Sequence, residues 1–275
     1  MKTSFPEDKK INRPERSILT IYGGAEQFSF SIYNPEEAGS YIYGELTDAD
    51  HAGSFSVFKE KFFDQTFLSL PFRKVWIMNH TPMFVFVPDA FYKDNYRDDF
   101  MDFLLSDREG IPLSDSIAPA GMKVLYQLPE DIYQFMLRSF AKPEFIHYSV
   151  PLITSFINKS KQFNVSQMVV NLQKTGLDIF CFSRDAFLFG NYFPYKNLSE
   201  VIYYILFTWK QLQFNQLNDY LHITGNSIFK NDLIQPLAIY IQHIYFLEIA
   251  PEIYFEGVNT SNIPFELAAL SLCEL

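Results

Sequence analysis

The sequence contains few side chains whose types and spacing could support catalysis. The densest group is in the segment TDADHAG, where Asp48, Asp50 and His51 lie almost side by side. Two carboxylates and an imidazole can bind a divalent metal or act as an acid–base pair. A polar turn before a helix has the same composition, and a helix-like segment follows here. We therefore favour the turn.

Four further histidines lie in or beside segments that read as helices or strands. None belongs to an HExxH pattern or to another paired metal-binding spacing. The chain also lacks the GxSxG, GxxxxGK(S/T) and GxGxxG patterns of nucleophilic hydrolases, P-loop proteins and dinucleotide-binding proteins. We therefore expect structural roles for these four residues: His80, His147, His222 and His243.

The composition is typical of a globular protein with a large core. The 275 residues suffice for one large domain or for two smaller ones. Hydrophobic residues make up 48% of the chain and aromatic residues 18%. We expect most aromatic side chains to lie in the core. The alternative is that some of them form an exposed patch for a partner.

Charge, cysteine content and hydropathy exclude several classes. The formal net charge is −10 and no run of Lys and Arg is present, which disfavours binding to nucleic acid. Cys181 and Cys273 lie far apart and indicate neither a disulfide scaffold nor a thiolate metal site. The first residues lack the apolar stretch of a signal peptide, and the longest apolar run, 201–209, is too short to span a bilayer. We expect a soluble, cytoplasmic protein.

Any site must be positioned by helices and strands, and those of the first half can be predicted from hydrophobic spacing and turn residues. Residues 1–15 read as a flexible tail. Three runs rich in β-branched and aromatic residues then predict an antiparallel meander, and hydrophobic spacing predicts a helix over 55–70. The predicted strands are 18–22, 28–33, 41–46, 74–78, 83–87, 123–128 and 145–150. The other predicted helices are 95–105, 129–140 and 151–161.

The second half repeats this pattern. Its predicted strands are 167–170, 177–182, 186–193, 220–224 and 252–255, and its predicted helices are 198–214, 231–249 and 264–272. Asn197 or Ser199 is the expected N-cap of the first helix, and Pro236 predicts a kink or a late start in the second. The first half thus reads βββαββα and then βαβα, and the second half reads βββαβαβα. Together they predict a duplicated α/β fold, βββαβαβα in each half, with mixed sheets covered by helices. The predicted domains are 16–162 and 163–275.

Several segments resemble the actin-like ATPase (ribonuclease H-like) superfamily. The segment MKVLYQLPEDIYQFMLRSFAKPEFIHYSVPLITSF, residues 122–156, is similar to the part of that fold that leads into its second domain. The segment SNIPFELAALSLCEL is similar to the C-terminal helix that packs back at the hinge. The similarity is closest to the pilus-assembly and cell-division members, and to a small uncharacterised bacterial family with the same fold. The resemblance implies a duplicated α/β fold with a ligand cleft between its halves.

In that superfamily one loop from each half encloses the phosphates of a nucleotide. Glycines allow close approach of the backbone, and an acidic residue serves the metal or the attacking water. In the first loop, LTIYGGAEQFSF, the resemblance places the acidic position at Ile21 or Tyr22, followed by Gly23 and Gly24. Neither Ile nor Tyr can replace the carboxylate, and a Gly-Gly pair between strands is also an ordinary hairpin turn.

The second loop lies within MVVNLQKTGLDIFCF. Here Asn171 takes the acidic position and Gln173 takes a glycine position. Lys174 and Thr175 could bind an anion, although a solvated turn has the same residues. Asp178 lies in the following strand, so we do not count it as a candidate.

The segment YLHITGNS resembles the adenosine loop. Gly225 and Asn226 stand there in place of two glycines, and Asn tolerates the left-handed conformation that such a turn needs.

The resemblance thus implies a nucleotide site without its acidic residues. We expect a non-catalytic, pseudo-ATPase protein that serves as an interaction scaffold for a protein partner, with no cofactor. The alternatives are a protein that binds ATP and Mg²⁺ at an altered site and a sugar-kinase-like enzyme that uses the same cleft.

Overall fold

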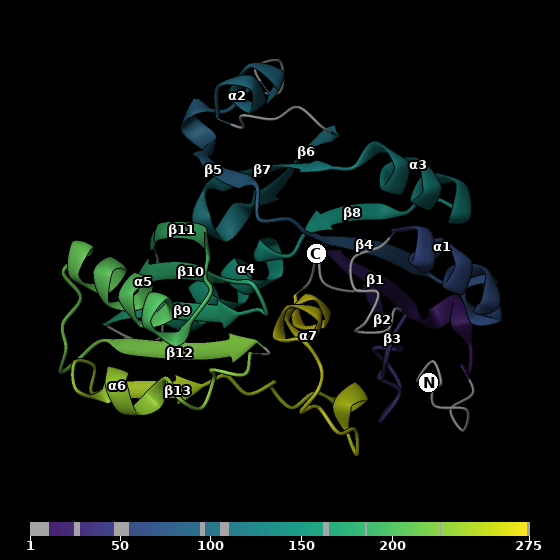
Figure 1. Cartoon of the computed structure of the whole chain (residues 1–275). Coiled ribbons are helices and arrows are strands. Elements are labelled where there is room, and N and C mark those ends of the chain that lie inside the picture. The colour runs from purple at the N-terminus through teal and green to yellow at the C-terminus, as the bar shows by residue number, and fades with distance from the viewer. Residues whose placement is uncertain are drawn as a thin grey trace.

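The protein is described by a computed structural model that covers residues 11–24, 28–46, 55–93, 97–104, 110–161, 165–184, 186–225 and 227–273. Two five-stranded mixed sheets, one from each half of the chain, form its frame (Figure 1). The duplicated βββαβαβα architecture expected from the sequence is confirmed. None of the helices in the described ranges is long and apolar enough to cross a membrane.

The first sheet has the order β3-β2-β1-β4-β8. Strands β1, β2 and β3 form the antiparallel meander, and β4 and β8 run parallel to β1. Helices α1 and α3 bury their apolar faces against one side of this sheet. The bounds are β1 (Ile18–Gly24), β2 (Phe28–Tyr33), β3 (Ile42–Glu45), β4 (Lys74–His80), β8 (Glu144–His147), α1 (Phe55–Asp64) and α3 (Glu130–Ser139).

The second sheet has the equivalent order, β11-β10-β9-β12-β13. Strands β9, β10 and β11 are antiparallel, and β12 and β13 run parallel to β9. Helices α5 and α6 cover one side of it. The bounds are β9 (Ser166–Leu172), β10 (Gly176–Ser183), β11 (Ala186–Pro194), β12 (Tyr220–Gly225), β13 (His243–Phe246), α5 (Leu198–Gln211) and α6 (Ile234–Ala238).

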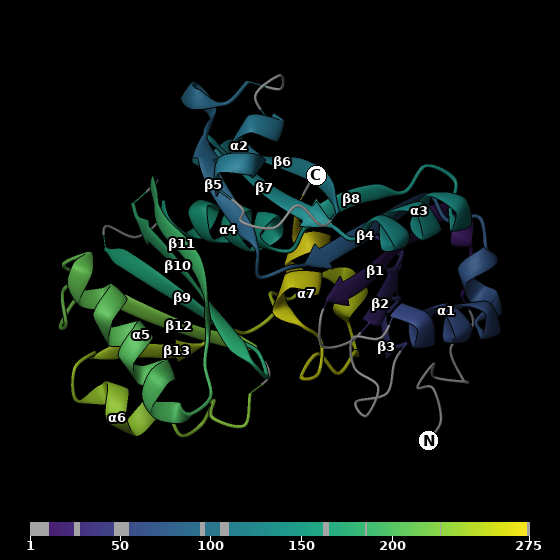
Figure 2. The same cartoon turned by 45° about the horizontal axis from the view of Figure 1, so that its top comes forward.

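Helices α4 (Ser149–Ser160) and α7 (Phe265–Leu272) lie between the two sheets (Figures 1 and 2). They pack against each other and share one hydrophobic core with residues of both sheets, among them Met78 of β4 and Phe180 of β10. The last helix of the chain therefore packs back between the halves, as the resemblance implies. Residues 162–164 lie outside the described residues, and the boundary between 162 and 163 stays a prediction.

A small antiparallel sheet is inserted between β4 and α3. It consists of β5 (Phe84–Pro88), β7 (Met122–Leu128) and β6 (Ile111–Ile117) in that order, with α2 (Arg97–Leu104) packed against it. The strand β6 was not predicted, because its sequence IPLSDSI combines a proline with three polar residues. Pairing with β7 along its whole length makes it a strand nonetheless.

The helix predicted over 231–249 is wrong. Only Ile234–Ala238 is α-helical, and His243–Phe246 forms the edge strand β13 beside β12. Pro236 lies in the first turn of α6, where a missing backbone N–H is tolerated. The free edge of β12 has backbone N–H and C=O groups that need partners. Hydrogen bonding of residues 243–246 to this edge outweighs their tendency to continue the helix.

Three other predicted elements need correction, two in their boundaries and one in its type. The predicted helix over 55–70 ends at Asp64 and is followed by a 3-10 turn, Thr66–Ser69. The strand predicted over 145–150 ends at His147, because α4 begins at Ser149. The strand predicted over 252–255 is a 3-10 turn, Ile253–Phe255, whose aromatic residues Tyr254 and Phe255 pack into the central core.

The N-cap of α5 is Asn197, one of the two residues proposed from the sequence. Its side-chain oxygen accepts a hydrogen bond from the backbone N–H of Glu200 at 3.0 Å. The carboxylate of Glu200 in turn accepts from the side-chain amide of Asn197 at 3.1 Å. This reciprocal arrangement stabilises the first turn of the helix.

Candidate functional site

A cleft of about 1090 Å³ lies between the two halves. Its walls come from the ends of β1 and β4, from β3, from the β9–β10 hairpin, from the end of β12 and from the segments 247–249 and 258–266. These are the places where strands of both sheets end, which is where ligands bind in open α/β sheets. We therefore take this cleft as the candidate site.

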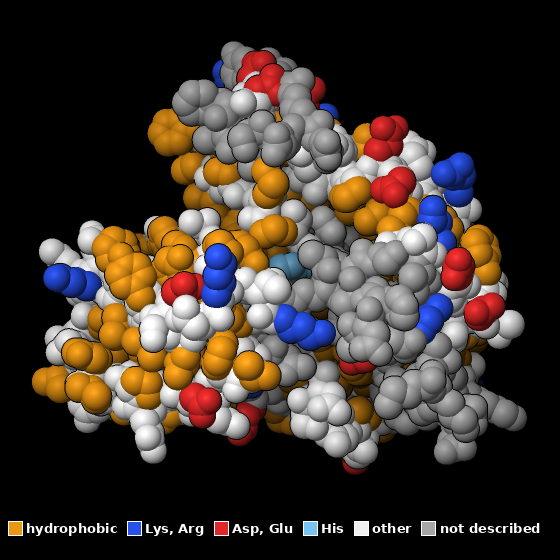
Figure 3. All heavy atoms as spheres, in the orientation of Figure 1, with side chains coloured by type: hydrophobic (Ala, Val, Ile, Leu, Met, Phe, Trp, Pro, Cys, Tyr) orange, Lys and Arg blue, Asp and Glu red, His pale blue; other side chains and the backbone are white. Residues whose placement is uncertain are grey.

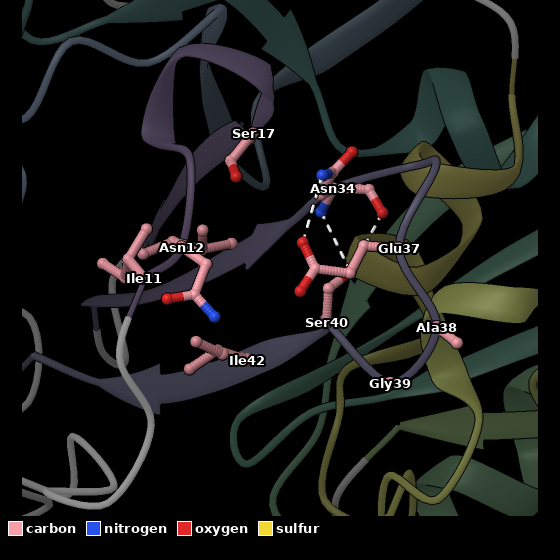
Figure 4. A pocket seen from close by; sticks show the side chains of 10 residues that line it. Ile11, Asn12, Ser17, Asn34, Glu37, Ala38, Gly39, Ser40 and Ile42 are labelled. Carbon is pink, nitrogen blue, oxygen red and sulfur yellow. Dashed lines mark hydrogen bonds between the residues drawn. The ribbon is translucent and has the colours of Figure 1, made fainter.

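A second pocket, of about 250 Å³, lies beside β2 and β3 (Figure 4). Its polar groups bond mainly to one another. The side-chain amide of Asn34 donates to Glu37 at 3.3 Å, and the hydroxyl of Ser40 donates to the carbonyl oxygen of Asn34 at 2.9 Å. This pocket therefore offers fewer open groups to a ligand than the cleft.

The carboxylate of Asp178 is the centre of a buried network at the inner end of the cleft. Asp178 lies in β10 and is fully buried. Its Oδ1 accepts a hydrogen bond from the hydroxyl of Tyr148. Its Oδ2 accepts from the side-chain amides of Asn171, at 3.2 Å, and Gln173, at 3.1 Å. Three donors thus share the charge of one carboxylate.

His80 joins this network from the first half. Its Nε2 lies 3.7 Å from Oδ2 of Asp178 and also accepts a hydrogen bond from the side-chain amide of Gln173. The ring of His80 packs on that of Tyr148, with centroids 4.0 Å apart. The network therefore connects the end of β4 to the β9–β10 hairpin and holds the two halves together at this point.

A second buried pair links β1 to α7. The hydroxyl of Tyr22 donates to Oε1 of Glu266 at 2.6 Å, and Glu266 is 5% exposed. Burial, followed by the negative charge of Glu266 and then by the hydrogen bond to it, raises the pKa of Tyr22 well above its usual value. Burial likewise raises the pKa of Glu266, although the hydrogen bond from Tyr22 acts in the opposite direction.

Of the two candidates for the acidic position in the first predicted loop, Tyr22 lies at the cleft and Ile21 does not. Tyr22 lines the cleft, whereas Ile21 is fully buried on the α1 side of the sheet. Gly23 and Gly24 end β1. A Cβ on Gly23 would lie 2.4 Å from the ring of Phe28, so the small residue has a packing role here. Residues 25–27 lie outside the described part of the chain.

The second predicted loop is the tight β9–β10 hairpin, closed by a hydrogen bond from Gln173 N–H to the carbonyl oxygen of Gly176 at 2.9 Å. Asn171, Gln173 and Lys174 line the cleft. Lys174 and Thr175 are exposed at the tip, where the carbonyl oxygen of Thr175 accepts from the N–H of Tyr195. The structure thus brings Asn171 and Gln173 together at Asp178, and it leaves Lys174 and Thr175 at the surface.

At position 225, in the predicted adenosine loop, the backbone conformation and the lack of space require a glycine. Its φ is +89°, and a Cβ would lie 2.0 Å from the carbonyl oxygen of Leu172 in β9. The carbonyl oxygen of Gly225 accepts a hydrogen bond from Nζ of Lys230 at 3.2 Å. Asn226 lies outside the described residues, as do Asp48, Asp50 and His51.

The remaining histidines make structural contacts. The ring of the fully buried His147 bonds to the hydroxyl of Ser149 at 2.7 Å, and that of His222 bonds to Gln167 at 3.1 Å. His243 packs edge-on against Tyr220. Within the described ranges no group of three His, Cys, Asp or Glu side chains is arranged to hold a metal ion.

The sequence does not mark four residues of this site as functional: His80, Tyr148, Asp178 and Glu266. For Asp178 a signal exists, because this carboxylate lies inside the apolar run LDIFCF and a carboxylate among buried neighbours needs hydrogen-bond partners. No local pattern marks the other three, because their partners are distant in sequence.

The residues present do not fit Mg²⁺ and a nucleotide triphosphate as the superfamily holds them. The resemblance places the two acidic positions at Ile21 or Tyr22 and at Asn171, and none of these side chains can neutralise a hydrated dication. Both oxygens of Asp178 accept hydrogen bonds within the protein. The side chain of Gln173, for which the resemblance implies a glycine position, bonds to this network.

Comparisons with known proteins agree with this fold. A protein of unknown function with an actin-like ATPase fold, from Bacteroides thetaiotaomicron VPI-5482, is 28% identical, with a TM-score of 0.82 over 95% of this chain and 97% of that chain. The PilM–PilN type IV pilus biogenesis complex matches at 9% identity and a TM-score of 0.60, over 93% of this chain and 97% of that chain, which shows the fold alone. No curated protein matches the sequence. Residues 6–244 match the family described as Protein of unknown function (DUF3822), and the chain, an actin-like ATPase fold by its architecture, belongs to that family.

Proposed function

We propose that this protein is a non-catalytic actin-like protein, a pseudo-ATPase, that acts as a scaffold for a protein partner. The observation that carries the proposal is the network around Asp178. Side chains of the protein itself, above all Gln173 and His80, bond to one another where a nucleotide phosphate would need open donors and its metal ion would need open acceptors. A cleft arranged in this way favours a fixed relation between the two halves over turnover of a nucleotide.

Exposed aromatic residues support the partner-binding part of the proposal. Tyr203 and Phe207 of α5 are 58% and 47% exposed, and their rings stack with centroids 5.5 Å apart. Figure 3 shows hydrophobic side chains spread over the surface of the second half, where α5 and α6 lie. One solved protein of this fold, PilM, is in a complex with a protein partner, PilN. Surface aromatics of this kind are typical of protein interfaces.

The proposal is tested by calorimetric titration of the protein with ATP and Mg²⁺, and with ADP. We expect no heat of binding and no shift in melting temperature at millimolar nucleotide. A nucleotide at one hundred times its Kd would stabilise the fold by about 2.7 kcal/mol, which a melting experiment detects easily. Binding at micromolar affinity that Lys174→Ala weakens would instead establish the ATP-binding alternative.

The partner is tested separately. A protein recovered with the wild-type chain should be lost with the double variant Tyr203→Ser, Phe207→Ser. The matched control is Phe63→Ser, because Phe63 on α1 is 74% exposed and lies on the first half. Equal recovery by all three chains would place the interface elsewhere.

A further inference from the structure

A buried carboxylate oxygen at the cleft lacks a partner. Glu266 lines the cleft and is 5% exposed. Its Oε1 accepts the hydrogen bond of Tyr22, whereas its Oε2 has no hydrogen-bond partner among the described residues. Leaving a carboxylate oxygen buried and unpaired is costly, so such an atom beside a cleft indicates a missing donor.

The surroundings of Glu266 favour a cationic donor. Tyr22 and Tyr43 line the same wall, and the charge of Glu266 acts on the hydroxyls of both. Glu45 adds a second carboxylate to this wall. Carboxylates and tyrosine rings together attract organic ammonium groups. No Lys or Arg of the described residues pairs with Glu266, and the imidazole of His80 lies beside Asp178.

Other residues that line the cleft carry the opposite charge. Lys174, from the β9–β10 hairpin, and Lys230, from the segment after β12, both line the cleft. Neither forms an ion pair with a carboxylate within the described ranges. Nζ of Lys230 donates to the carbonyl oxygen of Gly225 and lies 5.2 Å from the ring centre of Phe246, which leaves further donors for a ligand. Burial lowers the pKa of Lys230, and a bound anion would oppose that shift.

We propose that the cleft binds a small zwitterionic molecule, with an ammonium group at Oε2 of Glu266 and a carboxylate or phosphate at Lys174 and Lys230. The ligand supplies the donor that Glu266 lacks and the anion that the two lysines lack. The proposal goes beyond the scaffold function, since it makes the cleft a ligand-controlled element of a protein that does not turn over nucleotide.

The test is titration with ω-amino acids of increasing length, from γ-aminobutyrate to ε-aminocaproate and longer homologues, with hexylamine and hexanoate as single-charge probes. We expect binding by at least one member of the series, followed by calorimetry and melting temperature. That member should bind more tightly than either single-charge probe. Glu266→Gln should weaken binding of that member by about tenfold or more, because an ionic hydrogen bond is lost.

Two controls separate charge from folding. Gln at position 266 can still accept a hydrogen bond from Tyr22, so the variant is expected to fold, and a melting curve of Glu266→Gln without ligand checks this. Glu256→Gln removes an exposed charge outside the cleft and should have no effect.

The outcomes distinguish this proposal from the scaffold function. The failure of every ω-amino acid to bind, or equal binding by Glu266→Gln and the wild type, would overturn it and leave the scaffold function untouched. Nucleotide binding that depends on Lys174 and Lys230 but not on Glu266 would contradict both.

Discussion

The two halves have the same strand order, yet equivalent positions carry different chemistry. Tyr22 pairs with Ser29 near the end of the β1–β2 hairpin, and Asn171 pairs with Asp178 near the end of the β9–β10 hairpin. Tyr22 makes one hydrogen bond, to Glu266 of α7. Asp178 accepts three, one of them from a residue that follows the first sheet, Tyr148. Duplication therefore fixes where polar groups meet, and the individual residues decide what they do there.

The comparison predicts that the second hairpin contributes more to stability than the first. Asp178→Ala would leave the buried donors of Tyr148 and Asn171 unpaired and remove one hydrogen bond of Gln173, at a cost of about 4 kcal/mol in the free energy of unfolding. Ser29→Ala, at the equivalent position, should cost about 1 kcal/mol or less. Urea denaturation of both variants gives the two values. Equal losses would show that the halves do not differ in this respect.

Gly225→Ala tests how tightly the backbone of β12 packs against the β9–β10 hairpin. An alanine there must adopt a φ of +89° and would meet the carbonyl oxygen of Leu172, so we expect a loss of about 3 kcal/mol. The matched control is Gly121→Ala, since Gly121 has a φ of +60° but open space around its Cβ position. The control isolates the conformational cost, about 1 kcal/mol. Equal losses in melting experiments would remove the steric argument.

The inserted sheet, which only the first half contains, should add a pH dependence. Burial raises the pKa of Asp115 from 3.8 to about 6, while its Oδ2 accepts from the N–H of His147 at 2.6 Å. Because its pKa is raised, Asp115 keeps its proton in the folded protein at pH values at which the unfolded chain has lost it. The contribution of Asp115 to stability is therefore complete below pH 3.8 and is lost as the pH rises through about 6.

The expected loss over this range is about 3 kcal/mol, and Asp115→Asn should abolish it. Asn keeps an acceptor for His147 but cannot ionise. Urea denaturation at several pH values measures the difference between variant and wild type. The control Asp64→Asn, at an exposed position on α1, should follow the wild type. A variant whose stability falls as steeply as that of the wild type would assign the dependence to another group.

The smallest effect is expected at the first hairpin. Tyr22→Phe removes the hydrogen bond to Glu266 and should cost about 1 kcal/mol near neutral pH. The loss is limited because Glu266, whose pKa is already raised by burial, can take up a proton. The cost should therefore shrink as the pH falls, which unfolding measurements at two pH values can detect. A cost that grows in acid would contradict this account.

Local patterns predicted the fold well where the chain forms hairpins and amphipathic helices. The meander over β1 to β3 and the cap of α5 at Asn197 follow from alternation, turn residues and capping chemistry, all of which are local. The strand β13 could not be predicted in this way. The strand forms because residues 243–246 pair in parallel with β12, and β12 is separated from them in sequence by α6.

The site was less predictable than the fold for the same reason. The hairpin residues Asn171 and Gln173 follow from the resemblance, but their role depends on Asp178, His80 and Tyr148. These three meet only after β4, β8 and β10 have paired with their neighbours. Glu266 reads as an ordinary residue in the first turn of a helix, and only packing between the sheets buries it.

The position of α7 has a consequence for synthesis of the chain. Tyr22 leaves the ribosome 244 residues before its partner Glu266. Until α7 emerges, the inner faces of both sheets and of α4 remain without the helix that covers them. During that interval the nascent chain exposes apolar surface that its own fold covers only later, and such surface favours aggregation.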